Sequence, residues 1–156
     1  MVSVAGLKRV VWPMALGLCA LASHSAAAPP TYYGNSGAPY SEAVQVGDML
    51  YLSGQIGVVP GTTKPVPGGM AAEARQTMDN IGAILARRRL GFDDLVKCTV
   101  MLTDMSEWAA FNAIYVGYFK PGNLPARSAF GATALASGGR IELECWAYSP
   151  MKKAKR

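Results

Sequence analysis

The chain has 156 residues, 51% of them apolar, a length that suits one globular domain with a sizeable core. Its formal net charge of +5 comes from the two ends, from Lys8 and Arg9 and from the basic residues after Met151. The body between them is close to neutral, which argues against a platform for nucleic acid.

Residues 1–27 have the parts of a secretory signal peptide. Lys8 and Arg9 form a basic start, an apolar run follows over residues 10–22, and small residues lead up to Ala27. The apolar run is too short to span a bilayer comfortably. We expect cleavage after Ala27 and export to the bacterial periplasm, with no stable membrane anchoring afterwards. An uncleaved anchor is the alternative.

Cleavage at this point would change the inventory of reactive side chains. His24 is the only histidine and would leave, which excludes Ser-His-Asp and Cys-His mechanisms and histidine-ligated metal sites. Cys19 would leave too, unless it carries a lipid. Cys98 and Cys145 remain, each in an expected strand. They could form a disulfide if their strands are neighbours, but two buried thiols that pack as small apolar side chains are the preferred alternative.

The first half of the mature chain is organised by proline and glycine. Residues 28–39 are rich in Pro, Gly and Tyr without any periodic pattern, and we expect a leader there. Two extended runs, 44–46 and 49–55, flank Gly47-Asp48 and predict a hairpin. Residues 58–69 contain three prolines and three glycines, which predicts a loop.

A helical pattern follows this loop. An apolar stripe predicts a helix that starts at Met70, with Gly91 as its stop signal. The basic run 87–89 would then lie at the end of the helix, where cations favour its dipole. The stripe consists of Met70, Ala74, Met78, Ile81 and Leu85.

A strand and a second helix come next. Alternation over residues 96–102 predicts a strand. Asp104 and Glu107 are expected to form a capping box, in which Asp104 accepts from the amide of Glu107 and Glu107 reaches back. Phe111, Ile114, Tyr115 and Tyr118 would form the buried stripe of the helix that follows. Asn112 lies beside this stripe, and its spacing alone indicates no function.

The stretch from Pro125 to Tyr148 concentrates polar residues on two further extended runs, divided by the loop 136–139. Arg127 opens the first run, and Glu142 and Glu144 share one face of the second. If the two runs are neighbouring strands, these side chains would form a compact polar site. A solvated sheet face is the alternative, and the residues by themselves favour it.

The predicted order is hairpin, helix, strand, helix, strand, strand. This order is typical of an α+β fold with one mixed β-sheet and both helices packed on one face. Tyr51, Trp146 and Tyr148 would then lie on the other face, which indicates oligomerisation as their cover. The sequence contains no phosphate-binding loop or metal-ligand cluster, so we expect no metal and no cofactor.

Several motifs in this order resemble the RidA family (reactive intermediate deaminase A, also called YjgF). They are Ala-Pro-Tyr40-Ser, Ser53-Gly54-Gln55, the helix segment 74–80, Asn112 with Tyr115, Pro-Ala-Arg127-Ser, and Ile-Glu142-Leu-Glu144. The resemblance implies a chorismate-mutase-like α+β fold and a homotrimer whose sheets form a central barrel, with sites at the subunit interfaces. We accordingly divide the chain into a signal peptide (1–27), a leader (28–39), a RidA-like domain (40–150) and a basic tail (151–156).

The resemblance also implies roles for individual residues. Arg127 would hold the carboxylate of a small imino acid such as 2-iminopropanoate, formed from 2-aminoacrylate. Glu142 would position or activate the attacking water, and Tyr40, Ser53 and Asn112 would close the pocket around the substrate. Hydrolysis would give a 2-keto acid and ammonia.

Two departures from the family pattern leave other functions open. Ala129 stands where many members carry cysteine, and the signal peptide is unusual for a mostly cytosolic family. A non-catalytic binder of small carboxylates is one alternative to a deaminase, and an endoribonuclease is another.

Overall fold

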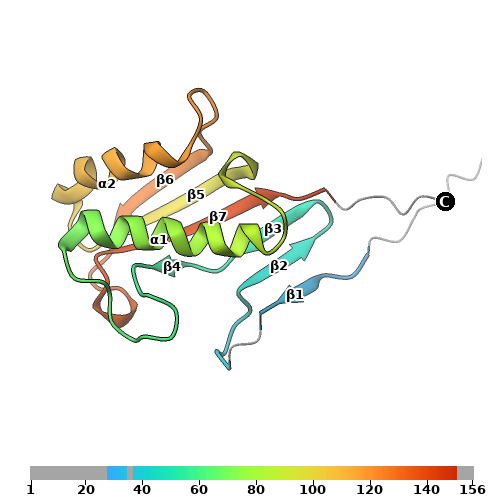
Figure 1. The fold of residues 1–156 in the computed structure, drawn as a ribbon, viewed down its shortest axis with the longest axis horizontal. Coiled ribbons are helices and arrows are strands. Elements are labelled where there is room, and N and C mark those ends of the chain that lie inside the picture. Colours follow the sequence, from blue (N-terminus) through green and yellow to red (C-terminus); the bar gives the residue numbers. More distant parts are fainter. Residues whose placement is uncertain (1–27, 35–36, 151–156) are drawn as a thin grey trace, which may run out of the picture.

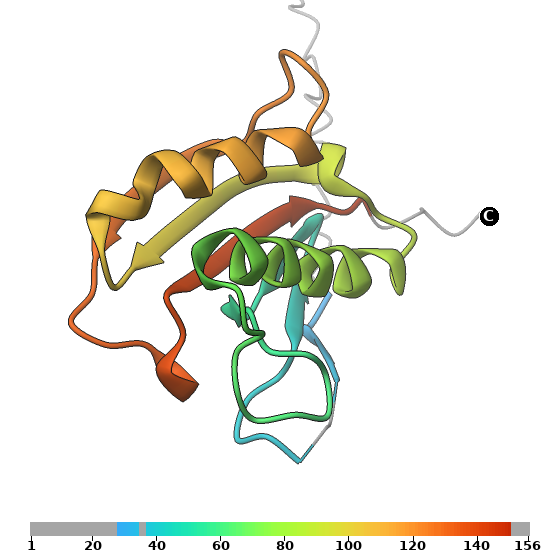
Figure 2. The ribbon, with the colours of Figure 1, turned by 60° about the vertical axis from the view of Figure 1, so that its left-hand side comes forward.

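The computed structural model describes residues 28–34 and 37–150, so the expected signal peptide and basic tail lie outside the described residues. One mixed sheet carries both helices, α1 (Gly69–Ala86) and α2 (Trp108–Tyr115), on the same face (Figure 1, Figure 2). The predicted α+β class and the order of the elements are confirmed. No helix in this part of the chain is long and apolar enough to cross a membrane.

The sheet runs in the order β1-β2-β3-β7-β5-β6, and β4 pairs with β7 as well. Its β5–β6 pair is parallel and the other strand pairs are antiparallel. The strands are β1 (Thr31–Tyr33), β2 (Ala43–Val46), β3 (Met49–Leu52), β4 (Gln55–Ile56), β5 (Leu95–Leu102), β6 (Ala126–Gly131) and β7 (Ile141–Tyr148). Because β5 lies between β6 and β7, the two C-terminal strands are not neighbours.

Two details of the N-terminal half differ from the expected pattern. β1 lies inside the stretch expected to be a leader, and it joins the edge of the sheet through pairs such as Tyr33 with Ala43. Three residues are too few to show alternation. The expected single run 49–55 is divided into β3 and β4, which both pair with β7 on either side of the break at Ser53-Gly54.

The core lies between the helices and the sheet. The whole predicted stripe of α1 is buried, as are the alternate residues of β5 and β7 that face the helices. The opposite face carries Tyr51 against Trp146, with their ring centroids 5.1 Å apart, and Trp146 and Tyr148 are exposed. The predicted division of β7 into an apolar and a polar face is therefore confirmed.

The end of α1 differs from the prediction. The helix ends at Ala86, because Arg89 takes a left-handed conformation (φ 60°) and the amide of Leu90 bonds the carbonyl of Leu85 at 3.1 Å. Arg87 and Arg88 both pair with Glu42 beside β2. The basic run thus ties the end of the helix to the sheet.

The capping box expected before α2 is wrong in both halves, because the amide of Glu107 bonds the backbone oxygen of Asp104 and not its side chain. Asp104 accepts from the amide of Ser106 at 2.8 Å, and hydrogen bonding from the Ser106 side chain, and next from its amide, lowers the pKa of the Asp104 carboxyl. Glu107 does not reach back, because Arg140 donates to its carboxylate at 3.1 Å. The amide of Arg140 also donates to Glu73, so one residue at the start of β7 ties together α1 and the entry to α2.

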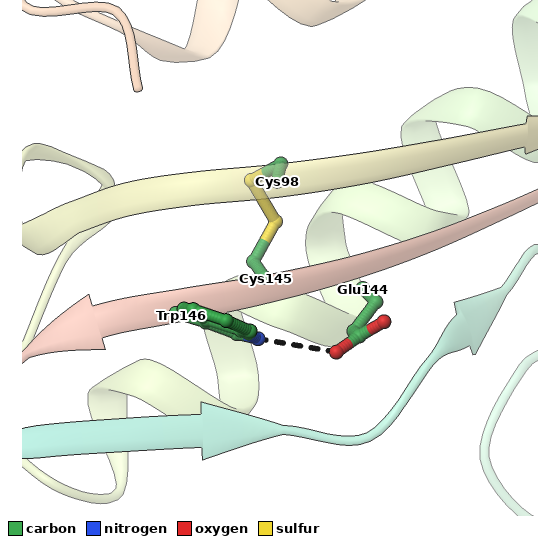
Figure 3. The surroundings of a disulfide bond; sticks show 4 residues. All are labelled: Cys98, Glu144, Cys145 and Trp146. Atoms are coloured by element: carbon green, nitrogen blue, oxygen red, sulfur yellow. Dashed lines mark hydrogen bonds between the residues drawn. A yellow bond between two sulfur atoms is a disulfide. The ribbon is translucent and has the colours of Figure 1, made fainter. Parts of the chain in front are cut away.

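Cys98 and Cys145 form a disulfide between β5 and β7 (Figure 3). The two residues are partners in the strand register, their Cα atoms are 4.2 Å apart, and both are fully buried. The preferred alternative of two separate thiols was therefore wrong. Alternation places each cysteine in a strand, but only the pairing of β5 with β7 brings the two together.

Candidate functional site

Arg127 lies against α2, on the helix-covered side of the sheet. It is the register partner of the buried Cys98, so its side chain leaves β6 on the same face as the core. The guanidinium carbon lies 4.6 Å from the ring centroid of Trp108 and 4.7 Å from that of Tyr115. Phe111 is farther away, at 5.8 Å. These distances are within the range of cation–π contacts.

Three buried polar atoms of β6 and α2 have no hydrogen-bond partner within the described residues. They are Arg127 Nη1, the Tyr115 hydroxyl and Asn112 Oδ1. Asn112 and Tyr115 are one helical turn apart on α2. Burial raises the pKa of Tyr115 to about 12, although the charge of Arg127 opposes this rise. Because buried polar groups are normally paired, this group has unused capacity to bind a polar ligand.

Glu142 belongs to a second cluster, on the other face of the sheet. Its register partner is Met101 rather than a core residue, and its side chain is half-buried. A Cβ added at Gly54 would lie 2.9 Å from Glu142 Cδ and would overlap its Oε1. The carboxylate therefore occupies space that only glycine at position 54 leaves free. Burial, and next the charge of Glu144, raise the pKa of Glu142.

Ser53 adjoins this second cluster in the chain, and Tyr40 shares a cavity with Gly54. Ser53 precedes Gly54, and its hydroxyl donates to the backbone oxygen of Ser41 at 2.6 Å. Tyr40 is 63% exposed and lines an open cavity of about 490 Å³ together with Gly54 and Gln55. This cavity offers an aromatic wall and polar backbone next to the carboxylate cluster.

The structure thus brings the predicted site residues together in two groups. Arg127 lies against α2, the helix that carries Asn112, while Glu142, Ser53 and Tyr40 lie around the break between β3 and β4. The compact site expected from neighbouring strands is wrong for a single chain, because β5 separates β6 from β7 and the two key side chains leave opposite faces.

Trp108 and Gly54 are two contributors whose site role the sequence analysis missed. Trp108, Phe111 and Tyr115 follow a helical spacing that predicts a shared face, but that spacing does not reveal a cation beneath it. Ala129 lies two residues after Arg127 on the same face, where it pairs with Val100, and it is exposed. Within residues 28–34 and 37–150, no group of three or more His, Cys, Asp or Glu side chains could hold a metal ion.

Comparisons with known proteins agree with the motifs. The family model described as Endoribonuclease L-PSP matches residues 34–149. The mouse protein 2-iminobutanoate/2-iminopropanoate deaminase is 46% identical over 106 residues, which cover 68% of this chain and 78% of the relative.

Solved structures give the same answer. The crystal structure of RidA from the Antarctic bacterium Psychrobacter sp. is 37% identical, with a TM-score of 0.68, and covers 75% of this chain and 94% of its own. The yeast protein YEO7 is 34% identical, with a TM-score of 0.71, and covers 78% and 99%. The chain therefore belongs to the RidA (YjgF) family, the family of the Endoribonuclease L-PSP model.

Proposed function

We propose that this protein is a hydrolytic deaminase of reactive imines and enamines of the 2-iminopropanoate type, like the relatives named 2-iminobutanoate/2-iminopropanoate deaminase. The observation that carries the proposal is the half-buried side chain of Arg127, whose buried Nη1 has no partner among the described residues. A planar fork with free donors is suited to the carboxylate that every such substrate carries.

The proposed reaction needs little machinery. Arg127 holds the substrate carboxylate. Glu142 accepts a proton from a water molecule while the oxygen of that water bonds to the iminium carbon. The resulting carbinolamine takes up that proton on nitrogen, and as the C–N bond breaks its hydroxyl gives a proton back to Glu142, from which solvent or the departing ammonia takes it. Ammonia leaves as the 2-keto acid forms. The raised pKa of Glu142 makes it a stronger base than an ordinary carboxylate. Tyr40, Ser53 and Asn112 complete the pocket in this proposal.

We further propose a homotrimer with its sites at the subunit interfaces. The position of Arg127 and Glu142 on opposite faces supports it, because a neighbouring copy could supply the member that each chain lacks locally. The exposed aromatic residues Trp146 and Tyr148 also support it, since a partner's surface would cover them.

Export to the periplasm belongs to the proposal as well. The Cys98–Cys145 disulfide supports it, because disulfides persist in oxidising compartments and are rare in the cytosol. N-terminal sequencing of protein recovered from the periplasm of a bacterial host tests it. We expect the mature chain to start at Ala28, and protein that stays in the cytoplasm with Met1 would contradict this.

The deciding experiment measures keto-acid release from freshly generated 2-iminopropanoate by the mature chain. At substrate concentrations below KM, Arg127→Ala should lose most of the acceleration, whereas Arg75→Ala, which removes an exposed arginine from α1, should keep it. If the parent protein does not speed the release, or if Arg127→Ala is as fast as the parent, the proposal fails.

Binding and RNA-degradation assays on the same protein preparation distinguish two alternative functions from the deaminase. A non-catalytic binder would bind 2-ketobutyrate in calorimetry while turning over no imine. A ribonuclease would degrade added RNA. A deaminase, prepared free of contaminating nucleases, should leave that RNA intact. Turnover of imine together with intact RNA supports the deaminase alone.

A further inference from the structure

Aromatic rings surround the guanidinium of Arg127, and the proposed reaction gives them no role. From this arrangement we infer that Trp108 and Tyr115 are positioning residues, which hold the guanidinium of Arg127 so that its N–H donors stay free for a substrate carboxylate. This inference rests on the proposed function for the identity of the ligand, and it assigns to two side chains a role that acts through a third.

Arg127 is held by aromatic rings and not by a carboxylate of the described residues. Guanidinium groups in proteins are usually held by carboxylates, which take up the in-plane N–H donors. None of the ion pairs among the described residues includes Arg127. Ring faces hold this cation instead, with Trp108 and Tyr115 at nearly equal distances of 4.6 and 4.7 Å. A ring attracts the charge without accepting all of its hydrogen bonds, so the donors remain available.

The rings that hold Arg127 are packed against one another and form a rigid surface. Trp108, Phe111 and Tyr115 follow one another along α2, and Phe119 follows just beyond its end, with successive centroids 5.8, 5.3 and 4.7 Å apart. Phe111 and Tyr115 are almost fully buried. Side chains packed in this way keep their rotamers, so the guanidinium rests against a fixed surface rather than a mobile one.

Loss of the rings should change KM more than kcat. The substrate carboxylate does not change during hydrolysis, so its contact with Arg127 is equally strong in the ground state and in the transition state. Loss of such uniform binding raises KM and leaves kcat nearly unchanged. A loosened ring cage should therefore appear as weaker binding of carboxylates, not as a slower chemical step.

The test uses the full mature chain and two ligands, 2-ketobutyrate and its neutral amide, with binding measured by calorimetry beside KM and kcat for 2-iminopropanoate. Trp108→Leu and Tyr115→Leu should each weaken binding of the acid, and raise KM, about tenfold, the size of a partly desolvated cation–π contact. Binding of the amide should not change. Trp108→Phe and Tyr115→Phe keep a ring and should recover most of the lost affinity.

A matched control removes an aromatic ring that does not touch Arg127. Tyr118 packs on Phe92 with centroids 5.0 Å apart and bonds Asp79, so Tyr118→Leu should lower the melting temperature while leaving acid binding at the parent value. Trp108 is only partly buried, so Trp108→Leu is expected to fold even if Tyr115→Leu does not.

The outcomes separate this inference from the proposed function. If Trp108→Leu binds 2-ketobutyrate as tightly as the parent does, or weakens the acid and the amide equally, the inference is overturned while the deaminase stands. If the parent turns over no imine yet loses acid binding selectively in Trp108→Leu, the inference stands while the deaminase falls.

Discussion

Gly54 has a role that follows from its lack of a side chain. It allows the Glu142 carboxylate to lie against the break between β3 and β4, in space that a Cβ would fill. We predict that Gly54→Ala displaces this carboxylate and lowers kcat/KM about a hundredfold, the cost of a displacement of about 1 Å in an active site. Steady-state kinetics on 2-iminopropanoate measure this.

The control is Gly117→Ala. A Cβ at position 117 would meet nothing within 4 Å, so this variant should keep the activity and stability of the parent. Full activity in Gly54→Ala would show that Glu142 does not act from its present position.

The protonation of Glu142 leads to a prediction about pH. Burial and Glu144 raise the pKa of Glu142 above its ordinary value of 4.5, so the carboxyl stays protonated, and unable to accept a proton from water, up to a higher pH. The acid limb of kcat/KM should therefore lie above pH 4.5. Glu144→Gln removes the like charge and should move this limb downward. A limb that persists unchanged in Glu142→Gln would rule out Glu142 as its source.

Stability should depend on the same group with a definite sign. The folded protein binds the Glu142 proton more tightly than the unfolded chain does. The resulting contribution to the free energy of unfolding is fully present below pH 4.5 and is lost as the pH rises through the raised pKa. Urea denaturation of the parent and of Glu142→Gln across this window should show the difference.

At the level of the elements, the disulfide joins the two central strands. Its bond closes a loop with a sequence separation of 47 residues. Loop-closure entropy predicts that the double variant Cys98→Ala/Cys145→Ala lowers the free energy of unfolding by about 4 kcal/mol. Urea denaturation measures this, and the parent under reducing conditions separates the lost bond from the lost packing. Equal midpoints for the oxidised and reduced parent would contradict the prediction.

The elements themselves could largely be predicted from local pattern. The α1 stripe and the alternation of β7 are confirmed, because burial on one face leaves a period in the sequence. The end of α1 could not be predicted, since Arg89 adopts a left-handed conformation without being glycine. The break at Ser53-Gly54 was missed for a related reason: the space beside Gly54 is filled by Glu142, which is far away in the chain.

For the whole molecule, the opposite orientation of Arg127 and Glu142 leads to a complementation test of the proposed trimer. If each site takes Arg127 from one subunit and Glu142 from its neighbour, inactive Arg127→Ala and Glu142→Gln chains should rebuild intact sites when they are mixed and reassembled. Random assembly in equal amounts should give about a quarter of the parent activity, because each contributor is intact in half of the subunits. Each variant reassembled alone is the control. Absence of recovery in proven mixed trimers would mean that the two residues do not share an interface site.

The order of the strands in the sheet could not be predicted from the local sequence pattern. Nothing in residues 126–131 or 141–148 indicates that β5 will lie between them, because strand order is decided by long-range pairing. The candidate residues were therefore predicted individually, and their division between two faces was not. Family resemblance supplied the roles that the polar pattern alone left open for Arg127 and Glu142.

The aromatic surface under Arg127 also gives the protein a built-in optical signal. Trp108 and Trp146 are the two tryptophans in the described residues, and Trp108 lies against the guanidinium. An anion that neutralises this cation alters the electric field at the Trp108 indole, and with it the emission. In a Trp146→Phe background, a fluorescence titration would then follow ligand binding at this position directly, without any attached dye.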